Sequence, residues 1–130
     1  MTEEQAKVRE YHERFGCTVN DRPTWAGQDE HRVRVALIEE ELAELRNAGE
    51  ARDLVEVADA LADLLYAVYG AAVAYGIDLE PVFQEIHAAN LTKGGGARRD
   101  GKVLKGPDYR PPRVAPIIRQ QLGLATAAVS

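Results

Sequence analysis

Acidic residues stand at helical spacing on two neighbouring segments that are otherwise rich in apolar residues. Three lie in each segment: Glu40, Glu41 and Glu44, then Glu56, Asp59 and Asp63. Residues three, four or seven positions apart share one face of an α-helix, so each segment carries an acidic face. A buried carboxylate is costly unless it is paired or binds a metal, and two facing acidic surfaces repel each other. A divalent cation would relieve both costs, and ligands that are all oxygen favour Mg²⁺, with Mn²⁺ as a substitute, over Zn²⁺.

The distribution of charge points in the same direction. The chain has 130 residues, which fits one domain, and a net charge of -5, which disfavours a broad nucleic-acid-binding surface. The segment 93–119 is basic, with only Asp100 and Asp108 against its cations: Lys93, Arg98, Arg99, Lys102, Lys105, Arg110, Arg113 and Arg119. An acidic region together with a basic segment is what an enzyme handling a metal-bound polyphosphate needs.

The sequence also bears on the compartment. The single Cys17 excludes an internal disulfide. The first residues lack the basic and apolar regions of a signal peptide, and no apolar run reaches the length of a membrane span. We therefore expect a cytoplasmic protein that binds neither nucleic acid nor a membrane.

Four helices must position these residues. Hydrophobic periodicity and capping residues predict them at about residues 2–15, 29–48, 53–75 and 78–90. Thr2 and Asp78 are suitable N-caps, while Gly16, Gly49 and Gly76 are suitable helix ends. The second and third helices have only a short connection, which predicts an antiparallel hairpin that brings the two acidic faces together.

The C-terminal part is predicted to be irregular. Residues 93–116 are rich in Gly, Pro and Arg and predict a basic loop, with a short helix at 116–122 and a flexible tail at 123–130. No strand is predicted, because β-branched alternation is absent. The expected fold is all-α: a four-helix bundle over residues 1–122 with an extended basic C-terminal arm.

Several short motifs follow one another along the chain. They are Glu40-Glu41-Leu42-Ala43-Glu44, Asp63-Leu64-Leu65-Tyr66, Ala89-Asn90-Leu91-Thr92-Lys93 and Arg98-Arg99-Asp100-Gly101-Lys102. Over about residues 8–113 they resemble the MazG-like, all-α nucleoside triphosphate pyrophosphohydrolases, and among these the members similar to dimeric dUTPases. The first segment fits the family pattern Glu-Glu-x-x-Glu.

The second half of the family pattern, Glu-x-x-Asp, fits in two registers. Glu56 and Asp59 match it literally, but the residues that follow Asp63 favour Asp63 as the family aspartate, and that register leaves Ala60 at the glutamate position. Asp59 can substitute, because positions i and i+4 share a helix face. Glu56 is then a candidate for a second metal or an outer position, and the choice between Glu56 and Asp59 stays open.

The resemblance implies hydrolysis between the α and β phosphates of a nucleoside triphosphate. In it, Glu41, Glu44, Asp59 and Asp63 would hold Mg²⁺, and Glu40 would orient or deprotonate the attacking water or hold a second metal. The expected substrate contacts are Asn90, Lys93, Arg98, Arg99, Lys102 and Lys105 with phosphates or sugar, and His12, Phe15, Trp25 and Tyr66 with base or sugar. The expected substrate is dUTP or a non-canonical nucleotide.

Simpler explanations exist for several of these residues. Glu39 belongs to the solvated face of its helix. Asn90 can simply end its helix, because Asn is common there. His12 can be a packed helix residue, and Trp25 can be a packing plug in its loop.

Two other functions fit the sequence. One is a pyrophosphohydrolase of the same superfamily that acts on dCTP or phosphoribosyl-ATP. The other is a non-catalytic helical dimer that binds nucleotides. The third helix is apolar on more sides than one small monomer covers, which predicts a homodimer or a dimer of dimers.

Overall fold

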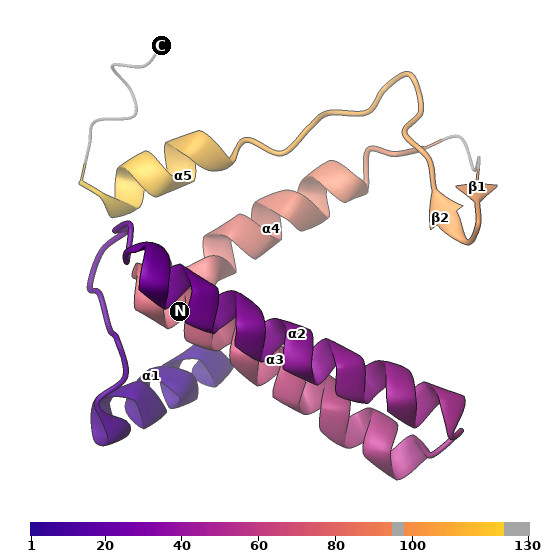
Figure 1. Ribbon diagram of the computed structural model, residues 1–130. Coiled ribbons are helices and arrows are strands. Elements are labelled where there is room, and N and C mark those ends of the chain that lie inside the picture. The colour runs from indigo at the N-terminus through magenta and orange to yellow at the C-terminus, as the bar shows by residue number, and fades with distance from the viewer. Residues whose placement is uncertain (95–97, 124–130) are drawn as a thin grey trace. The chain divides into compact units, whose positions relative to one another are not determined.

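The computed structural model describes residues 1–94 and 98–123, and helices dominate the first range (Figure 1). The helices are α1 (Glu3–Phe15), α2 (Gln28–Glu50), α3 (Leu54–Tyr75), α4 (Leu79–Asn90) and α5 (Val114–Gln121), and the strands are β1 (Arg98–Arg99) and β2 (Lys102–Val103). The all-α fold is confirmed. Of the flexible tail predicted at 123–130, all but Gly123 lies outside the described residues.

The chain forms two compact units, Met1–Ile77 and Asp78–Ser130. In the first unit, α2 and α3 run antiparallel as the predicted hairpin, and α1 packs against α3 (Figure 1). Thr2 caps α1 by accepting a hydrogen bond from the Gln5 N–H, and Asp53 caps α3 in the same way. Gly16 and Gly76 end α1 and α3 in the left-handed conformation, as predicted.

The end of α2 differs from the prediction. The helix continues through Gly49, which was expected to end it, to Glu50. Arg52 takes the left-handed conformation instead, with φ 54°. Its N–H donates to the Gly49 carbonyl, and the Asp53 N–H donates to the Ala48 carbonyl, so residues after the helix satisfy two carbonyls of its last turn.

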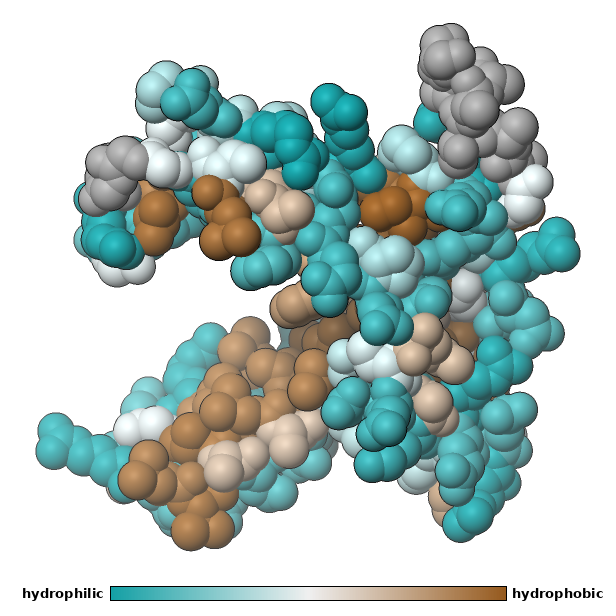
Figure 2. Space-filling view, turned by 180° about the vertical axis from the view of Figure 1, so that it is seen from behind, coloured by the Kyte–Doolittle hydropathy of each residue, from teal (hydrophilic) through white to brown (hydrophobic). Residues whose placement is uncertain are grey.

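The core of the first unit is built from small residues. Ala48 of α2 and Ala60, Ala72, Val73 and Ala74 of α3 are buried. Much of α3 is exposed in the chain by itself, since Leu54 is 82% and Val55 77% exposed. Figure 2 shows a hydrophobic band along the α2–α3 hairpin. Leu54, Val55, Leu61, Leu65 and Val68 of α3 are therefore exposed in the described chain.

By length and composition, α3 could cross a membrane, so the expectation that no apolar run is long enough was wrong. The core helix of a soluble protein passes the same test. Glu56, Asp59 and Asp63 lie on this helix, and charged residues inside a membrane are costly.

The second unit carries a small hairpin that was not predicted. β1 and β2 pair antiparallel around Asp100 and Gly101, both with positive φ. An Asp-Gly pair at a two-residue turn is the signal for such a hairpin. In the same unit Gln121 of α5 exchanges two hydrogen bonds with the backbone of Asp78, and the Arg110 guanidinium lies 2.7 Å from the Glu85 carboxylate.

Candidate functional site

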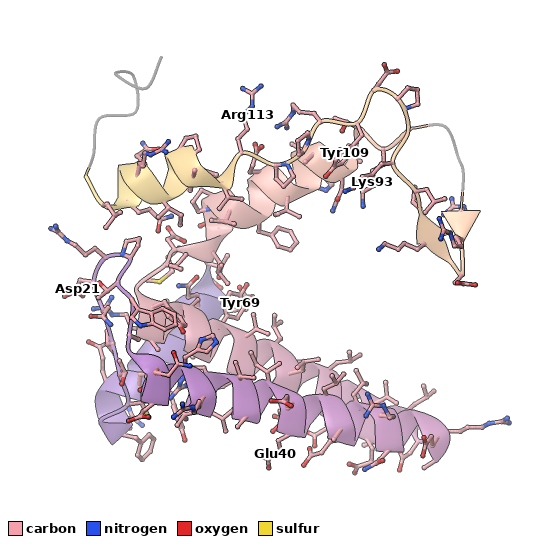
Figure 3. The ribbon with its side chains drawn as sticks, turned by 45° about the horizontal axis from the view of Figure 1, so that its top comes forward. Asp21, Glu40, Tyr69, Lys93, Tyr109 and Arg113 are labelled. Atoms are coloured by element: carbon pink, nitrogen blue, oxygen red, sulfur yellow. The ribbon has the colours of Figure 1, made fainter. Side chains whose placement is uncertain are left out.

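A cluster of carboxylates lies midway along α2. One oxygen from each of Glu40, Glu41 and Glu44 lies within 4.8 Å of the others, and Figure 3 shows Glu40 on this helix. The i, i+1, i+4 spacing places the three side chains at neighbouring positions on the helix surface. Glu39, predicted to be solvated, is exposed. The structure therefore brings together the acids of the Glu-Glu-x-x-Glu motif.

Glu41 is the least accessible member of this acidic cluster. Among the residues that the structure describes, its buried Oε2 atom has no hydrogen-bond partner. Burial raises the pKa of Glu41, and the charges of Glu44, Asp63 and Glu40 raise it further. A buried oxygen without a partner among several carboxylates fits a divalent cation, which would satisfy the oxygen and offset the repulsion.

Asp63 meets the acidic cluster from the opposite helix. Its charge acts on Glu41, and both residues line a pocket of about 290 Å³, which we call the inner pocket. Its other walls come from α1, α2 and α3: Tyr11, His12, Arg34, Leu37, Tyr66, Ala67 and Gly70. The predicted approach of Glu41 to Asp63 is confirmed.

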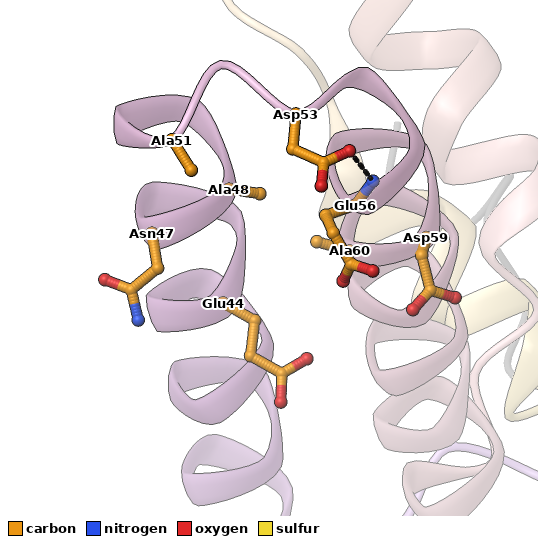
Figure 4. Close-up of a pocket in the computed structure, with 8 residues that line it drawn as sticks. All are labelled: Glu44, Asn47, Ala48, Ala51, Asp53, Glu56, Asp59 and Ala60. Carbon is orange, nitrogen blue, oxygen red and sulfur yellow. Dashed lines mark hydrogen bonds between the residues drawn. The ribbon is translucent and has the colours of Figure 1, made fainter.

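The remaining acids line a second pocket of about 510 Å³ near the α2–α3 turn, which we call the hairpin pocket (Figure 4). Glu44 reaches it from α2, while Glu56 and Asp59 reach it from α3. Ala60 lies in the same wall and is buried. Glu56 and Asp59 thus both have access to the space beside Glu44. The choice between them as metal ligands therefore stays open.

Arg34, which sequence reasoning missed, belongs to a ring of buried and half-buried polar groups. Its Nε donates to Glu30 at 2.6 Å, and the Thr18 hydroxyl donates to the other Glu30 oxygen. His12 Nδ1 lies 2.7 Å from the Thr18 carbonyl, and Arg34 Nη1 lies 3.4 Å from His12 Nε2. The sequence signal was present, because Glu30 and Arg34 have i, i+4 spacing and Arg34 lies two turns before Glu41.

The hydrogen bonds of this ring indicate which nitrogen of His12 carries the proton. A carbonyl only accepts, so Nδ1 carries the proton, and Nε2 accepts from Arg34. His12 is 3% exposed. The simpler explanation of His12 as a packed residue is therefore confirmed, although the same side chain also lines the inner pocket.

The other predicted base contacts fall in different places. Tyr66 lines the inner pocket and also a neighbouring one with Phe15 and Tyr11. Trp25 lies against His31 and Tyr75, with ring centroids 5.4 and 5.6 Å away, and is 63% exposed. Trp25 therefore packs on two aromatic side chains, in agreement with the simpler explanation, although much of its ring is exposed.

The predicted phosphate contacts all belong to the second unit. Arg98, Arg99 and Lys102 lie on the β1–β2 hairpin and are exposed, as is Lys105, whose ammonium lies 5.0 Å from the Tyr109 ring centroid. Lys93, labelled with Tyr109 and Arg113 in Figure 3, is half-buried. Asn90 is the last residue of α4, which agrees with the simpler explanation that it ends its helix. The binding of phosphate by these residues stays a prediction.

An antiparallel helix pair with gathered carboxylates is the arrangement expected of the all-α pyrophosphohydrolase class. The family model "Phosphoribosyl-ATP pyrophosphohydrolase" matches residues 8–90. The chain therefore belongs to the phosphoribosyl-ATP pyrophosphohydrolase family, whose members are MazG-like hydrolases of phosphoric anhydrides. The subgroup similar to dimeric dUTPases stays a prediction.

A curated relative comes from Acanthamoeba polyphaga mimivirus. The chain is 43% identical to this uncharacterized protein over 49 residues, which make up 38% of this chain. The matched part spans 20% of the length of the viral protein.

Proposed function

We propose that the chain is a Mg²⁺-dependent nucleoside triphosphate pyrophosphohydrolase, with dUTP or a non-canonical nucleotide as substrate. Water would attack the α-phosphorus, the bond to the bridging oxygen would break, and a nucleoside monophosphate and pyrophosphate would leave. The observation that carries the proposal is the buried, unpartnered Glu41 oxygen within the acidic cluster, in a chain of a pyrophosphohydrolase family.

The roles of the side chains follow from their positions. Glu41, Glu44 and Asp63 would hold the cation, with Asp59 or Glu56 beside Glu44. When bound, Mg²⁺ would neutralise phosphate charge and lower the pKa of a coordinated water. Glu40 is exposed next to Glu41, so it is placed to orient the water or to accept its proton.

A second substrate has a specific observation in its favour. The description of the matching family model names phosphoribosyl-ATP as the substrate, and this compound is also cleaved between phosphates to release pyrophosphate. The reaction and the metal site would be the same, so only the base-side pocket would differ. A comparison of turnover between dUTP and phosphoribosyl-ATP separates the two substrates.

The decisive test is pyrophosphate release from a panel of nucleoside triphosphates with Mg²⁺ or Mn²⁺. We expect release from the wild type and a loss of at least about 100-fold in Glu41→Gln and Asp63→Asn, because metal ligands are lost. Glu39→Gln, an exposed neighbour on the same helix, is the matched control and should keep full activity. Nucleotide binding without release from any substrate would instead favour the non-catalytic helical dimer.

We further propose that the enzyme is a cytoplasmic homodimer or dimer of dimers. The support is the exposed apolar surface of α3. Contiguous apolar surface of this kind is typical of interaction sites in soluble proteins.

A further inference from the structure

The inner pocket has two chemically different ends. Arg34 and Glu41 lie seven residues apart on α2, which is two turns or roughly 10 Å along the helix. On α3, Gly70 lies beside Arg34, and Asp63 lies beside Glu41. One end of the pocket therefore carries the predicted metal ligands, and the other carries the guanidinium of Arg34.

The Arg34 end is nearly neutral despite its ionised groups. Burial would raise the pKa of Glu30, but hydrogen bonds from Thr18 and Arg34 outweigh it and lower that pKa below its usual value. Glu30 therefore stays ionised beside the Arg34 cation, and the two charges offset each other. Since His12 faces Arg34 with an acceptor nitrogen, this end offers directed N–H donors with little net positive charge.

Some of these donors remain available. Nε bonds to Glu30 and one Nη1 proton to His12, which leaves three of the five guanidinium N–H groups without a partner among the described residues. The guanidinium lines the pocket, and Arg34 is only 8% exposed, so a ligand group there would meet it away from bulk water. A hydrogen bond in such a place discriminates strongly between ligands.

Gly70 makes this arrangement possible. A Cβ on Gly70 would lie 3.1 Å from Arg34 Nη1 and 3.3 Å from His12 Nε2. A side chain at position 70 would therefore force the guanidinium or the imidazole to shift by a few tenths of an ångström. The walls between the two ends include Tyr11, Tyr66 and Leu37, which suit the faces and edges of a flat ring.

We propose that Arg34 is a specificity-determining residue that selects nucleotides whose base presents a carbonyl oxygen where others present an exocyclic amine. The inference rests on the proposed function, since the triphosphate occupies the Glu41–Asp63 end. The base then reaches toward Arg34, whose N–H groups donate to a carbonyl and oppose an amine. The offset charge of the Arg34–Glu30 pair suits a neutral acceptor better than a phosphate.

The test compares substrates that differ at one base edge, dUTP with dCTP and dITP with dATP. We expect the wild type to have the higher kcat/KM for the carbonyl member of each pair. In Arg34→Gln that preference should fall by about 10- to 100-fold, the effect of losing a hydrogen bond to a charged group. Arg32→Gln, an exposed arginine on the same helix, should leave the preference unchanged.

Two further variants protect the test against misfolding. Arg34→Lys keeps the ion pair but not the fork of donors, and Gly70→Ala crowds the guanidinium and the imidazole without removing either. Both should lower the carbonyl preference in protein with a native circular dichroism spectrum. An unchanged preference in the folded variants, equal losses for both members of a pair, or a wild-type preference for the amine would each overturn the proposal.

Failure of the proposed function is recognised separately. If the wild type hydrolyses no nucleotide, calorimetry with the α,β-imido analogues of dUTP and dCTP measures the preference by binding alone. A tighter complex with the dUTP analogue that becomes equal in Arg34→Gln would keep the inference and reject the catalytic activity. Equal binding of both analogues by the wild type would reject the inference.

Discussion

At the scale of single residues, Glu41 is held in an unfavourable state. Its Oε2 atom is buried without a partner among the described residues, and three other carboxylates act on it. Without a cation, burial and these neighbouring charges make ionised Glu41 less favourable in the folded chain than in the unfolded one. Groups held in such an unfavourable state are often found at functional sites, where binding later compensates, and this fits the metal-binding role proposed for Glu41.

Glu41→Gln should therefore raise the melting temperature at neutral pH when a chelator removes divalent cations. The neutral amide relieves the repulsion, so we expect a gain of a few degrees. The same variant should lose the stabilisation that Mg²⁺ gives to the wild type. Thermal melts with and without Mg²⁺ measure both effects, and Glu39→Gln should behave as the wild type in each condition.

The pH dependence of Glu41 has the opposite sign from that of a paired carboxylate. Because its pKa is raised in the folded state, stability falls as pH rises from the unfolded value of about 4.3 through the raised value. Denaturant titrations in chelator across this range should show a steeper fall for the wild type than for Glu41→Gln. An identical slope for both proteins would show that Glu41 ionises normally.

Glu30 provides the contrasting case. Its pKa is lowered in the folded state. The stability that ionised Glu30 contributes is therefore fully present above its unfolded-state pKa, and it is lost as pH falls through its folded-state pKa. Glu30→Gln should cost about 1–3 kcal/mol at neutral pH, because Arg34 loses its charged partner. That difference should shrink in melts at decreasing pH, and a constant difference would contradict the ion-pair explanation.

Sequence patterns reach some of these residues and not others. The acids of the cluster repeat at helical spacing within an apolar context, so Glu41 and its meeting with Asp63 were predictable. The Arg34–His12 contact was not, since it joins residues 22 positions apart through a loop and depends on the bare backbone of Gly70. Contacts of this kind depend on tertiary packing rather than on periodicity.

At the scale of elements, capping residues determine where the helices end. Thr2, Asp53 and Asp78 accept N–H groups at three helix starts, and Gly16 and Gly76 terminate two helices. These signals are local, which is why the helix ranges could be predicted closely. The end of α2 escaped prediction because Arg52, not a glycine, adopts the left-handed conformation there.

The two terminating glycines separate backbone strain from steric clash. Gly16→Ala places a Cβ in open space, so only the left-handed strain of about 1–2 kcal/mol applies. In Gly76→Ala the Cβ would lie 2.2 Å from the Arg22 carbonyl oxygen, which adds the cost of displacing the 17–27 loop. We expect a loss of roughly 2–5 kcal/mol in chemical denaturation. Equal losses in the two variants would show that the loop moves freely.

At the scale of the whole molecule, exposed apolar side chains are the dominant feature. Along α3 they are Leu54, Val55, Leu61, Leu65 and Val68, and along α2 they include Val33, Val35, Leu37 and Leu42. The sequence predicted that the third helix exceeds what one monomer covers, and the exposed fractions agree. Which faces pair in an oligomer depends on a second chain, so neither sequence nor monomer determines it.

Leu61→Lys should weaken the proposed self-association, because it places a charge in the middle of the exposed α3 surface. Sedimentation velocity over a concentration series should show a shift toward the monomer by about tenfold or more in the dissociation constant. Ala6→Lys, the same charge change on an exposed position of α1, should leave the sedimentation unchanged. A wild type that sediments as a monomer would reject the oligomer.

Helix α3 has carboxylates toward α2, small residues at its packed end and exposed leucines and valines elsewhere. Almost every position along α3 therefore serves the acidic site, the packing of the helices or the exposed apolar surface. We expect few of its substitutions to be neutral. A library of all single substitutions would show α3 as a continuous stretch of low tolerance, whereas the exposed face of α1 would accept most changes. The two kinds of intolerance would also separate by assay, since replaced acids would leave abundance intact and lose turnover, while charges introduced among the leucines would lower abundance itself.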